Sequence, residues 1–385
     1  MDCDHYAARR CRSCRLLEVP RLRQVHDKEA HARAVIPATR WLPAATGDET
    51  GFRNKSKMVV GGSAQAPTLG ILDDARKGVD LRDCAIQEPG LRDALDVIAA
   101  FIARAALPPY DVASRSGELK HVLVTHSPDG ELMLRLVLRS TATEARVRKH
   151  LGWLVEQLAT LRVVSLNIQP QHKAVLEGDR EIVLTGARTL PMRLDTGITL
   201  HLGPQSFFQT NTRIAEQLYA QARDWVAALA PRRVWDLYCG VGGFALHLAA
   251  AGREVVGVEV SAEAIASAEV SAAEAAVGAS FVAGDATAYA LGHSPTAADL
   301  PDVVVVNPPR RGIGTELADW LERSSVPHVV YSSCNAESLA RDLSAMPSLR
   351  PVEGRVLDMF PHTHHYEVVV LLSRQPAPAA MVTHE

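Results

Sequence analysis

A cysteine near the end of the chain has the setting of a nucleophile. Cys334 follows an apolar run at 328–330, which we predict to be a buried strand, and precedes a helix start at residue 336. Open α/β sheets bind ligands at the carboxyl ends of their strands, and free N–H groups at a helix N-terminus favour a thiolate. We therefore expect Cys334 to be a reactive thiol. The alternative is a small buried core residue, as most free cysteines are.

Four other cysteines, Cys3, Cys11, Cys14 and Cys84, form a candidate metal site. Three lie within twelve residues and the fourth is distant, a spacing that can supply four thiolates to an iron–sulfur cluster or to zinc. Zinc ribbons normally bring two Cys-x2-Cys pairs and only one is present here, so we favour the cluster. The Cys-x3-Cys-x2-Cys spacing of radical enzymes does not occur in this segment. Unconnected surface cysteines are the alternative, although exposed free thiols are generally avoided.

A glycine-rich turn predicts a nucleoside-binding loop. Residues 233–244 run from an apolar strand through three glycines into a helix, and glycines let a ligand approach the backbone closely. Glu259, 23 residues after Asp236, has the place of the acid that binds both ribose hydroxyls. The turn lacks the full dinucleotide spacing. Its Asp-x-x-x-Gly-x-Gly-Gly pattern instead resembles the S-adenosylmethionine (SAM) loop of class I methyltransferases, where Asp285 fits the acid near the adenine.

Two further apolar strands carry polar residues at their ends. Asn307-Pro-Pro follows the strand predicted at 302–306, and the prolines fix the backbone that presents the Asn side chain. Asn-Pro-Pro is a known substrate-side motif of nucleic-acid and protein methyltransferases. Members that methylate exocyclic amines usually continue with an aromatic residue, and Arg310 stands there instead, which argues against that target. Glu367, at the edge of a strand at 368–372, is a second candidate functional group.

Composition limits the class of protein without naming a partner. The chain has 385 residues, 47% hydrophobic and 22% charged, which suits a globular protein of two domains or of one large domain with an appendage. A net charge of −3 gives no general attraction to nucleic acid but leaves room for a local basic face. We find no signal peptide and no apolar run of membrane-spanning length. We therefore expect a cytoplasmic protein with reduced thiols.

The elements that must position these side chains predict an α/β chain in three regions. Residues 1–90 hold the four clustered cysteines. Arg53, Lys55 and Lys57 recur there at period two, either as a solvated edge strand or as a strip that contacts phosphates. Residues 91–190 read as an α+β domain without a catalytic signature, which we expect to hold the substrate.

The elements expected in that central region are helices at 91–106 and 143–161 and strands at 120–126, 131–140, 163–168 and 181–185. From about residue 196 strands and helices alternate, which is typical of a parallel sheet. Asn211 is the expected N-cap of the first helix of this third region, 191–385.

Five motifs taken together resemble the RNA uracil-C5-methyltransferase family. They are Phe207-Phe-Gln-Thr-Asn211, Asp236-Leu-Tyr-Cys-Gly-Val-Gly-Gly243, Asn307-Pro-Pro-Arg-Arg-Gly312, Tyr331-Ser-Ser-Cys-Asn335 and Met359-Phe-Pro-His-Thr-His-His-Tyr-Glu367. The resemblance implies a C-terminal class I SAM-dependent, Rossmann-like methyltransferase domain beside the central α+β domain and the N-terminal iron–sulfur region. The N-terminal cysteines are similar to those of the branch that modifies 23S ribosomal RNA and binds a [4Fe-4S] cluster. The transfer-RNA branch typically lacks that cluster.

The resemblance also implies roles for individual residues. Cys334 would add to uracil C6 and Glu367 would remove the C5 proton. Arg310 and Arg311 would hold phosphate or the base. The residues expected to line the SAM site are Gln209, Tyr238, Glu259 and Asn307, and the expected cluster ligands are Cys3, Cys11, Cys14 and Cys84. Alternatives are the same reaction on transfer RNA or another ribosomal uridine, a non-catalytic iron–sulfur RNA-binding protein, or a small-molecule methyltransferase. We expect a monomer.

Overall fold

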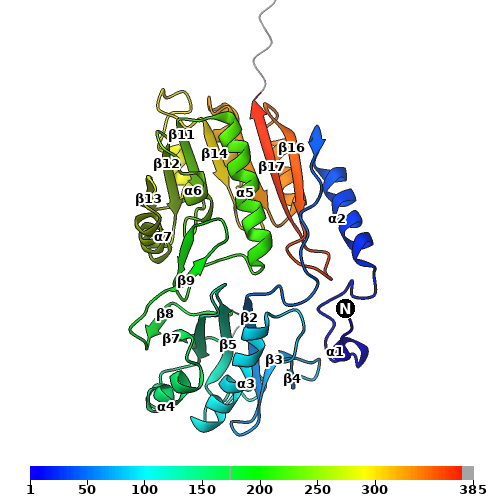
Figure 1. The fold of residues 1–385 in the computed structure, drawn as a ribbon, viewed down its shortest axis with the longest axis vertical. Helices are drawn as coiled ribbons and strands as arrows, with labels where there is room; N and C mark the ends of the chain where they lie inside the picture. The colour runs from blue at the N-terminus through cyan, green and yellow to red at the C-terminus, as the bar shows by residue number, and fades with distance from the viewer. Residues whose placement is uncertain (173–174, 375–385) are drawn as a thin grey trace, which may run out of the picture. The chain divides into compact units, whose positions relative to one another are not determined.

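The computed structural model of the chain describes residues 1–172 and 175–374 (Figure 1). The chain folds into two compact units. Unit 1 contains Met1–Arg21, Gly47–Glu216 and Phe360–His364, and unit 2 contains Leu22–Thr46, Gln217–Met359 and the described residues 365–374. Within the described residues, none of the helices has the length and apolar character of a membrane span.

Unit 2 is built on an eight-stranded sheet that is mostly parallel (Figure 1). In hydrogen-bonding order its strands are β1 (Arg40–Trp41), β16 (Leu349–Leu357), β17 (Glu367–Arg374), β15 (His328–Ser333), β14 (Val303–Val306), β11 (Arg233–Leu237), β12 (Glu254–Glu259) and β13 (Ala279–Ala283). The strands from β15 to β13 are parallel, whereas β17 is antiparallel to both of its neighbours. The strand order reverses between β11 and β14, and ligands bind at such a switch point in open α/β sheets.

Helices and strands alternate along unit 2, as the sequence pattern predicted. The helices of unit 2 are α2 (Arg21–Val35), the greater part of α5 (Thr212–Leu229), α6 (Gly243–Leu248), α7 (Ala262–Ala275), α8 (Ala286–Leu291), α9 (Thr315–Arg323) and α10 (Ala336–Ser344). Val304 and Val306 of β14 pack in one core with Trp320 of α9 and Leu339 of α10. The alternate residue Val305 is equally buried, so both faces of the strand are covered, as is usual in parallel sheets.

Unit 1 is built on a seven-stranded, mainly antiparallel sheet. In order its strands are β4 (Gly78–Asp80), β3 (Pro67–Leu72), β2 (Lys55–Gly62), β5 (Leu119–His126), β6 (Leu132–Leu138), β7 (Leu161–Ile168) and β8 (Arg180–Val183). Helices α3 (Pro89–Arg104) and α4 (Glu144–Gln157) pack their apolar residues against this sheet in one core. The short helix α1 (Asp4–Ala7) and the hairpin β9 (Leu190–Arg193) and β10 (Thr199–Leu202) complete the unit.

The elements predicted in the central region are all present, with shifted ends. The predicted helix 143–161 is shorter in the structure and ends at Gln157, because β7 already begins at Leu161. The sheet of unit 1 contains strands from both sides of the predicted boundary at residue 90, since β2 pairs with β5. The expected region boundaries at 90 and 190 therefore both fall inside one compact unit, which sequence patterns alone did not indicate.

Candidate active site

Cys334 lies at the junction that the sequence predicted, between a buried strand and a helix. β15 ends at Ser333 and α10 begins at Ala336. The intervening Asn335 is the N-cap of α10, and its Oδ1 accepts hydrogen bonds from the N–H groups of Glu337 and Ser338 at 3.2 and 3.4 Å. An Asn side chain in this position satisfies two of the free N–H groups of the first turn.

The ionisation of Cys334 differs from the sequence expectation. Burial raises the pKa of this thiol, and the neighbouring Glu367 raises it further, whereas Arg310 lowers it. The helix N-terminus stabilises a thiolate less than expected, because two of its N–H groups already donate hydrogen bonds to Asn335. The raised pKa favours the protonated thiol, and the influences that oppose this rise are the charge of Arg310 and a main-chain hydrogen bond.

Glu367 begins β17 and is almost fully buried, with 2% of its surface exposed. Burial raises the pKa of its carboxyl group to about 7, and a hydrogen bond from the Ser332 hydroxyl, at 2.8 Å from Oε1, lowers it. The structure thus brings Cys334 and Glu367 near each other. Cys334 directly follows β15, Glu367 begins the antiparallel β17, and the adjacent residues Ser333 and Val368 are paired. An acid with a pKa near neutrality can accept a proton from carbon and release it again.

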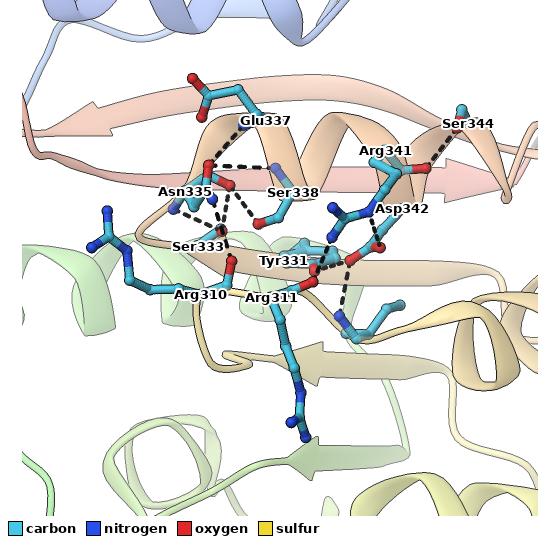
Figure 2. A network of polar contacts seen from close by, with 11 residues as sticks. Arg310, Arg311, Tyr331, Ser333, Asn335, Glu337, Ser338, Arg341, Asp342 and Ser344 are labelled. Atoms are coloured by element: carbon cyan, nitrogen blue, oxygen red, sulfur yellow. Dashed lines mark hydrogen bonds and ion pairs between the residues drawn. The ribbon is translucent and has the colours of Figure 1, made fainter. Parts of the chain in front are cut away.

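A polar network joins the cysteine segment to the loop after β14 (Figure 2). Asn335 Nδ2 donates to the carbonyl oxygen of Arg310 at 3.3 Å, and the Arg341 guanidinium donates to the carbonyl oxygen of Arg311. These hydrogen bonds therefore fix the main chain of both Arg310 and Arg311. Figure 2 shows their guanidinium groups extending away from this network.

Asp342 of α10 contacts the same loop at Ile313, two residues after Arg311. Its Oδ2 accepts hydrogen bonds from the Tyr331 hydroxyl at 2.6 Å and from the Ile313 N–H at 2.9 Å. Gly312 lies directly against it, with φ at +87°, and a Cβ added there would come within 2.2 Å of Asp342 Oδ2. Only glycine fits this turn, because the position combines a left-handed backbone with a close approach.

The glycine-rich turn connects β11 to α6 as predicted. Gly240 and Gly242 have φ values of +54° and +85°, and Tyr238 also has a positive φ of +69°, which is uncommon for a residue with a side chain. Asp236 is fully buried, and its Oδ2 accepts the N–H of Ala245 at 2.8 Å. Burial raises the pKa of Asp236 to about 7.

The other predicted cofactor residues of unit 2 lie at or after the carboxyl ends of parallel strands of the same sheet. Glu259 ends β12, and its two oxygens accept the N–H groups of Gly240 at 3.2 Å and Ser261 at 3.0 Å. Asn307 directly follows β14, which pairs with both β11 and β15. Asp285 caps α8 and accepts the N–H of Ala288 at 2.8 Å. This edge of the sheet is where a nucleoside cofactor binds in such folds.

Gln209 belongs to unit 1 and is buried. Its carbonyl oxygen accepts a hydrogen bond from Asn54 Nδ2 at 3.0 Å, while the same amide also donates to Thr212 Oγ1. The predicted N-cap is confirmed next to it, since Asn211 Oδ1 accepts the Ile214 N–H at 3.3 Å at the start of α5. The main chain on both sides of Gln209 is thus fixed.

The four clustered cysteines gather around one cavity of unit 1. Cys3, Cys11, Cys14 and Cys84 all line a hollow of about 220 Å³. Burial raises the pKa of Cys14 to about 11, and the other three thiols add to this rise, which shows that all four are electrostatic neighbours. In the part of the chain that the structure describes, no three His, Cys, Asp or Glu side chains are placed to hold a single metal ion.

The three cations that the sequence placed on one face of a strand, Arg53, Lys55 and Lys57, have different surroundings in the structure. Arg53 precedes β2, lines the cysteine cavity together with Lys57, and donates from Nε to the Lys55 carbonyl oxygen at 2.9 Å. Lys57 is exposed, whereas burial lowers the pKa of Lys55 to about 8. The three cations therefore do not form one solvated edge, and sequence reasoning missed the place of Arg53 because period two says nothing about which partner covers a strand.

The fold, together with the residues at the carboxyl ends of its parallel strands, defines a SAM-dependent methyltransferase. The sequence profile of a general methyltransferase domain matches residues 234–307, from β11 to Asn307. A solved tRNA (uracil-54, C5)-methyltransferase of Pyrococcus abyssi, in complex with S-adenosyl-L-homocysteine, superposes with a TM-score of 0.76. It is 24% identical, and the alignment covers 93% of this chain and 85% of the other, so it establishes the fold.

Sequence relatives narrow the class to one family. The profile of the tRNA (Uracil-5-)-methyltransferase family matches residues 299–375, which contain Cys334 and Glu367. The 23S rRNA (uracil(747)-C(5))-methyltransferase RlmC of Edwardsiella ictaluri is 48% identical over 98% of this chain and all of its own length. The RlmC of Halothiobacillus neapolitanus is also 48% identical, over 97% of this chain and all of its own. The chain belongs to the RlmC family of RNA uracil-C5-methyltransferases.

Proposed function

We propose that this protein methylates C5 of one uridine of 23S ribosomal RNA, the residue numbered 747 in the names of its relatives. The observation that carries the proposal is 48% identity over the whole length of an enzyme named for this reaction. The half-buried Cys334 and the buried Glu367 beside it support the proposal, since C5 methylation requires a nucleophile and a base.

Cys334 is the proposed nucleophile. Uracil C5 is a weak nucleophile by itself, and addition of the thiolate sulfur to C6 forms an S–C6 bond and moves the electrons of the C5=C6 double bond toward C5. The raised pKa of Cys334 keeps the sulfur protonated until substrate binds, and Arg310 is the cation that favours its ionisation. The thiol proton passes to solvent before or during this addition, because only the thiolate attacks.

Glu367 is the proposed base. After C5 has gained the methyl group it still carries its hydrogen, and removal of this proton restores the C5=C6 double bond as the C6–S bond breaks. The thiolate of Cys334 is thereby regenerated. A carboxyl group with a pKa of about 7 suits this step, since it is ionised in part of the molecules near neutral pH and its conjugate acid is not strongly acidic.

Four residues are proposed to hold SAM, namely Gln209, Tyr238, Glu259 and Asn307. When bound, SAM supplies an electrophilic methyl group. Glu259 fits a ribose, because its carboxylate is oriented by the N–H groups of Gly240 and Ser261 and keeps further lone pairs for two hydroxyls. The positive φ values of the turn fit a cofactor that approaches the backbone.

The RNA has to present a single base to this site. Uracil C6 is not accessible in a stacked helix, so the target nucleotide leaves its stack to reach Cys334. The guanidinium groups of Arg310 and Arg311 are proposed to hold phosphate or the base, because their main chain is fixed and their side chains extend outward (Figure 2). We further propose that the enzyme acts as a monomer in the cytoplasm.

A [4Fe-4S] cluster is proposed for the cavity lined by Cys3, Cys11, Cys14 and Cys84. Four thiols around one hollow fit such a group. Arg53 adds a positive charge to a cavity that would contain an anionic cluster. The cluster would organise this part of unit 1, since methyl transfer requires no electron transfer.

The proposal is tested by incubating the purified protein with SAM and unmodified 23S ribosomal RNA and measuring 5-methyluridine by mass spectrometry after nuclease digestion. Cys334→Ala and Glu367→Gln are run beside it. We expect product from the wild type and none from Cys334→Ala. Glu367→Gln is expected to accumulate a methylated covalent protein–RNA adduct, because the proton on C5 stays in place.

Other outcomes separate the alternatives. Product from Cys334→Ala would remove this residue from the mechanism. Product from transfer RNA and none from ribosomal RNA would place the protein with the transfer-RNA enzymes. If wild type gives no product with any RNA but still binds RNA, the protein is a binding protein and the methylation proposal is wrong.

A further inference from the structure

A single hydroxyl group contacts the carboxyl group of Glu367. Ser332 Oγ donates to Glu367 Oε1 at 2.8 Å, and both residues are buried, with 0% and 2% of their surface exposed. Across the described residues, 1–172 and 175–374, no other hydrogen bond to the Glu367 side chain is present. A buried carboxyl group with one hydrogen bond depends on that bond for its orientation.

The position of Ser332 follows from the strand pairing. β15 and β17 are antiparallel neighbours, and Ser332 lies opposite Val369, two residues after Glu367. Side chains alternate along a strand, and Tyr331 points into the core shared with α9 and α10, so Ser332 faces the other side. Two rigid central strands therefore hold both members of this contact.

We propose that Ser332 is the positioning residue of the base: its hydroxyl holds the Glu367 carboxyl group in one orientation and supplies the hydrogen bond that lets this buried group ionise. The inference rests on the proposed function, in which Glu367 removes the C5 proton. A hydroxyl suits this role because it donates to the carboxylate and can accept from the protonated acid, so the contact persists through the proton transfer.

The charged and titratable groups around Glu367 do not stabilise its carboxylate in the way that the Ser332 hydroxyl does. Cys334 and Tyr219 both sense the charge of Glu367, and Arg310 acts on Cys334. A neighbouring thiol and phenol offer no positive charge to the carboxylate. Burial already raises the pKa of Glu367 to about 7, and the Ser332 hydrogen bond is the influence that opposes burial. Loss of the hydroxyl therefore raises the pKa of the base further.

The test compares Ser332→Ala, Ser332→Thr and wild type in single-turnover reactions with SAM and RNA that carries tritium at uracil C5. Methyl incorporation reports the addition and transfer steps, and tritium release reports removal of the C5 proton. In Ser332→Ala we expect methyl incorporation to persist and tritium release at pH 7 to slow about five- to fifty-fold. A lost hydrogen bond to a charged group raises the pKa by about one to two units, and a rise of this size from about 7 lowers the ionised fraction of the base by that factor.

Two further readouts distinguish positioning from a general structural effect. The pH midpoint of tritium release is expected to move upward in Ser332→Ala, and Ser332→Thr, which retains a hydroxyl, is expected to return it toward the wild-type value. In a Glu367→Gln background, Ser332→Ala is expected to have no additional effect on proton removal. Thermal unfolding and binding of S-adenosylhomocysteine check that each variant is folded.

Several results would overturn the inference. A wild-type pH midpoint in folded Ser332→Ala would show that the hydroxyl does not act on the base. An equal loss of methyl incorporation and tritium release would assign Ser332 to an earlier step. If Ser332→Ala does not fold, Ser332→Thr alone decides. A pH midpoint of tritium release equal to that of wild type in Ser332→Thr supports the inference, and a shifted midpoint in this variant contradicts it. Wild type without 5-methyluridine product would instead refute the proposed function.

Discussion

Replacing Asp342 by alanine tests whether the contacts of α10 hold the loop after β14. Asp342 is buried, with 4% of its surface exposed, and one of its oxygens accepts both the Tyr331 hydroxyl and the Ile313 N–H. In Asp342→Ala both donors lose their acceptor inside the protein. An unsatisfied buried donor costs about 1–3 kcal/mol, so we expect a loss of about 2–6 kcal/mol in the free energy of unfolding.

A double-mutant cycle isolates one of the two bonds. Tyr331→Phe removes the hydroxyl and leaves the Ile313 contact, and a hydrogen bond to a charged group contributes about 1.5–3 kcal/mol. Because Asp342→Ala already removes the same bond, the double variant should be more stable than the sum of the single losses predicts, by about that amount. Ser344→Ala is the matched control on the same helix, since Ser344 Oγ contacts only the exposed Arg341 carbonyl oxygen, and we expect a change within about 0.5 kcal/mol.

Urea unfolding monitored by tryptophan fluorescence measures these changes. Four of the five tryptophans, Trp41, Trp225, Trp235 and Trp320, lie in unit 2, so the signal reports mainly on the unit that contains Asp342. The dependence of the free energy on urea should stay constant across the variants. A loss below about 0.5 kcal/mol in Asp342→Ala, or strictly additive losses in the cycle, would refute the reasoning.

Three further predictions concern buried charges. Lys28→Met removes the cation that lies 2.5 Å from the fully buried Asp358, and we expect a loss of about 3–5 kcal/mol in urea unfolding, more than for Arg23→Met, whose ion pair is exposed. Burial raises the pKa of Glu367 from 4.5 to about 7, so folding favours its protonated form. Stability therefore falls as pH rises from about 4.5 to 7, and Glu367→Gln should remove about 3 kcal/mol of this loss. Wild-type activity should rise with a midpoint near pH 7, where the base of the folded protein ionises. An unchanged pH dependence of unfolding in Glu367→Gln would contradict this. Arg53→Met should release iron to a chelator roughly tenfold faster than wild type. The control is Lys77→Met, since Lys77 is exposed and does not line the cysteine cavity; equal rates in Arg53→Met and wild type would show that Arg53 does not stabilise the cluster.

The local elements of the site were predictable from the sequence. The strand before Cys334, the helix from Ala336 and the turn at Gly240 have strong signals, because apolar runs, caps and glycines act over a few residues. The motifs around Cys334 and Glu367 also indicated the family, which the comparisons confirmed. Their individual roles stay predictions.

The ionisation of Cys334 was predicted in the wrong direction. The helix N-terminus was expected to favour a thiolate, whereas burial and the nearby Glu367 raise its pKa. The sequence shows the helix start but not the burial of the thiol or the use of its N–H groups by Asn335. Desolvation depends on everything that packs around a group, and this is set by the whole fold.

The sequence by itself determined which segments become strands, turns and helices, and which residue types stand at their ends. Tertiary structure alone decided which of these ends meet. Ser332 reaches Glu367, 35 residues away, only because β17 pairs antiparallel with β15 in one register, and Arg53 reaches the cysteine cavity through the packing of unit 1. Strand order and register depend on contacts between distant segments, and a periodic pattern within one segment contains no information about them.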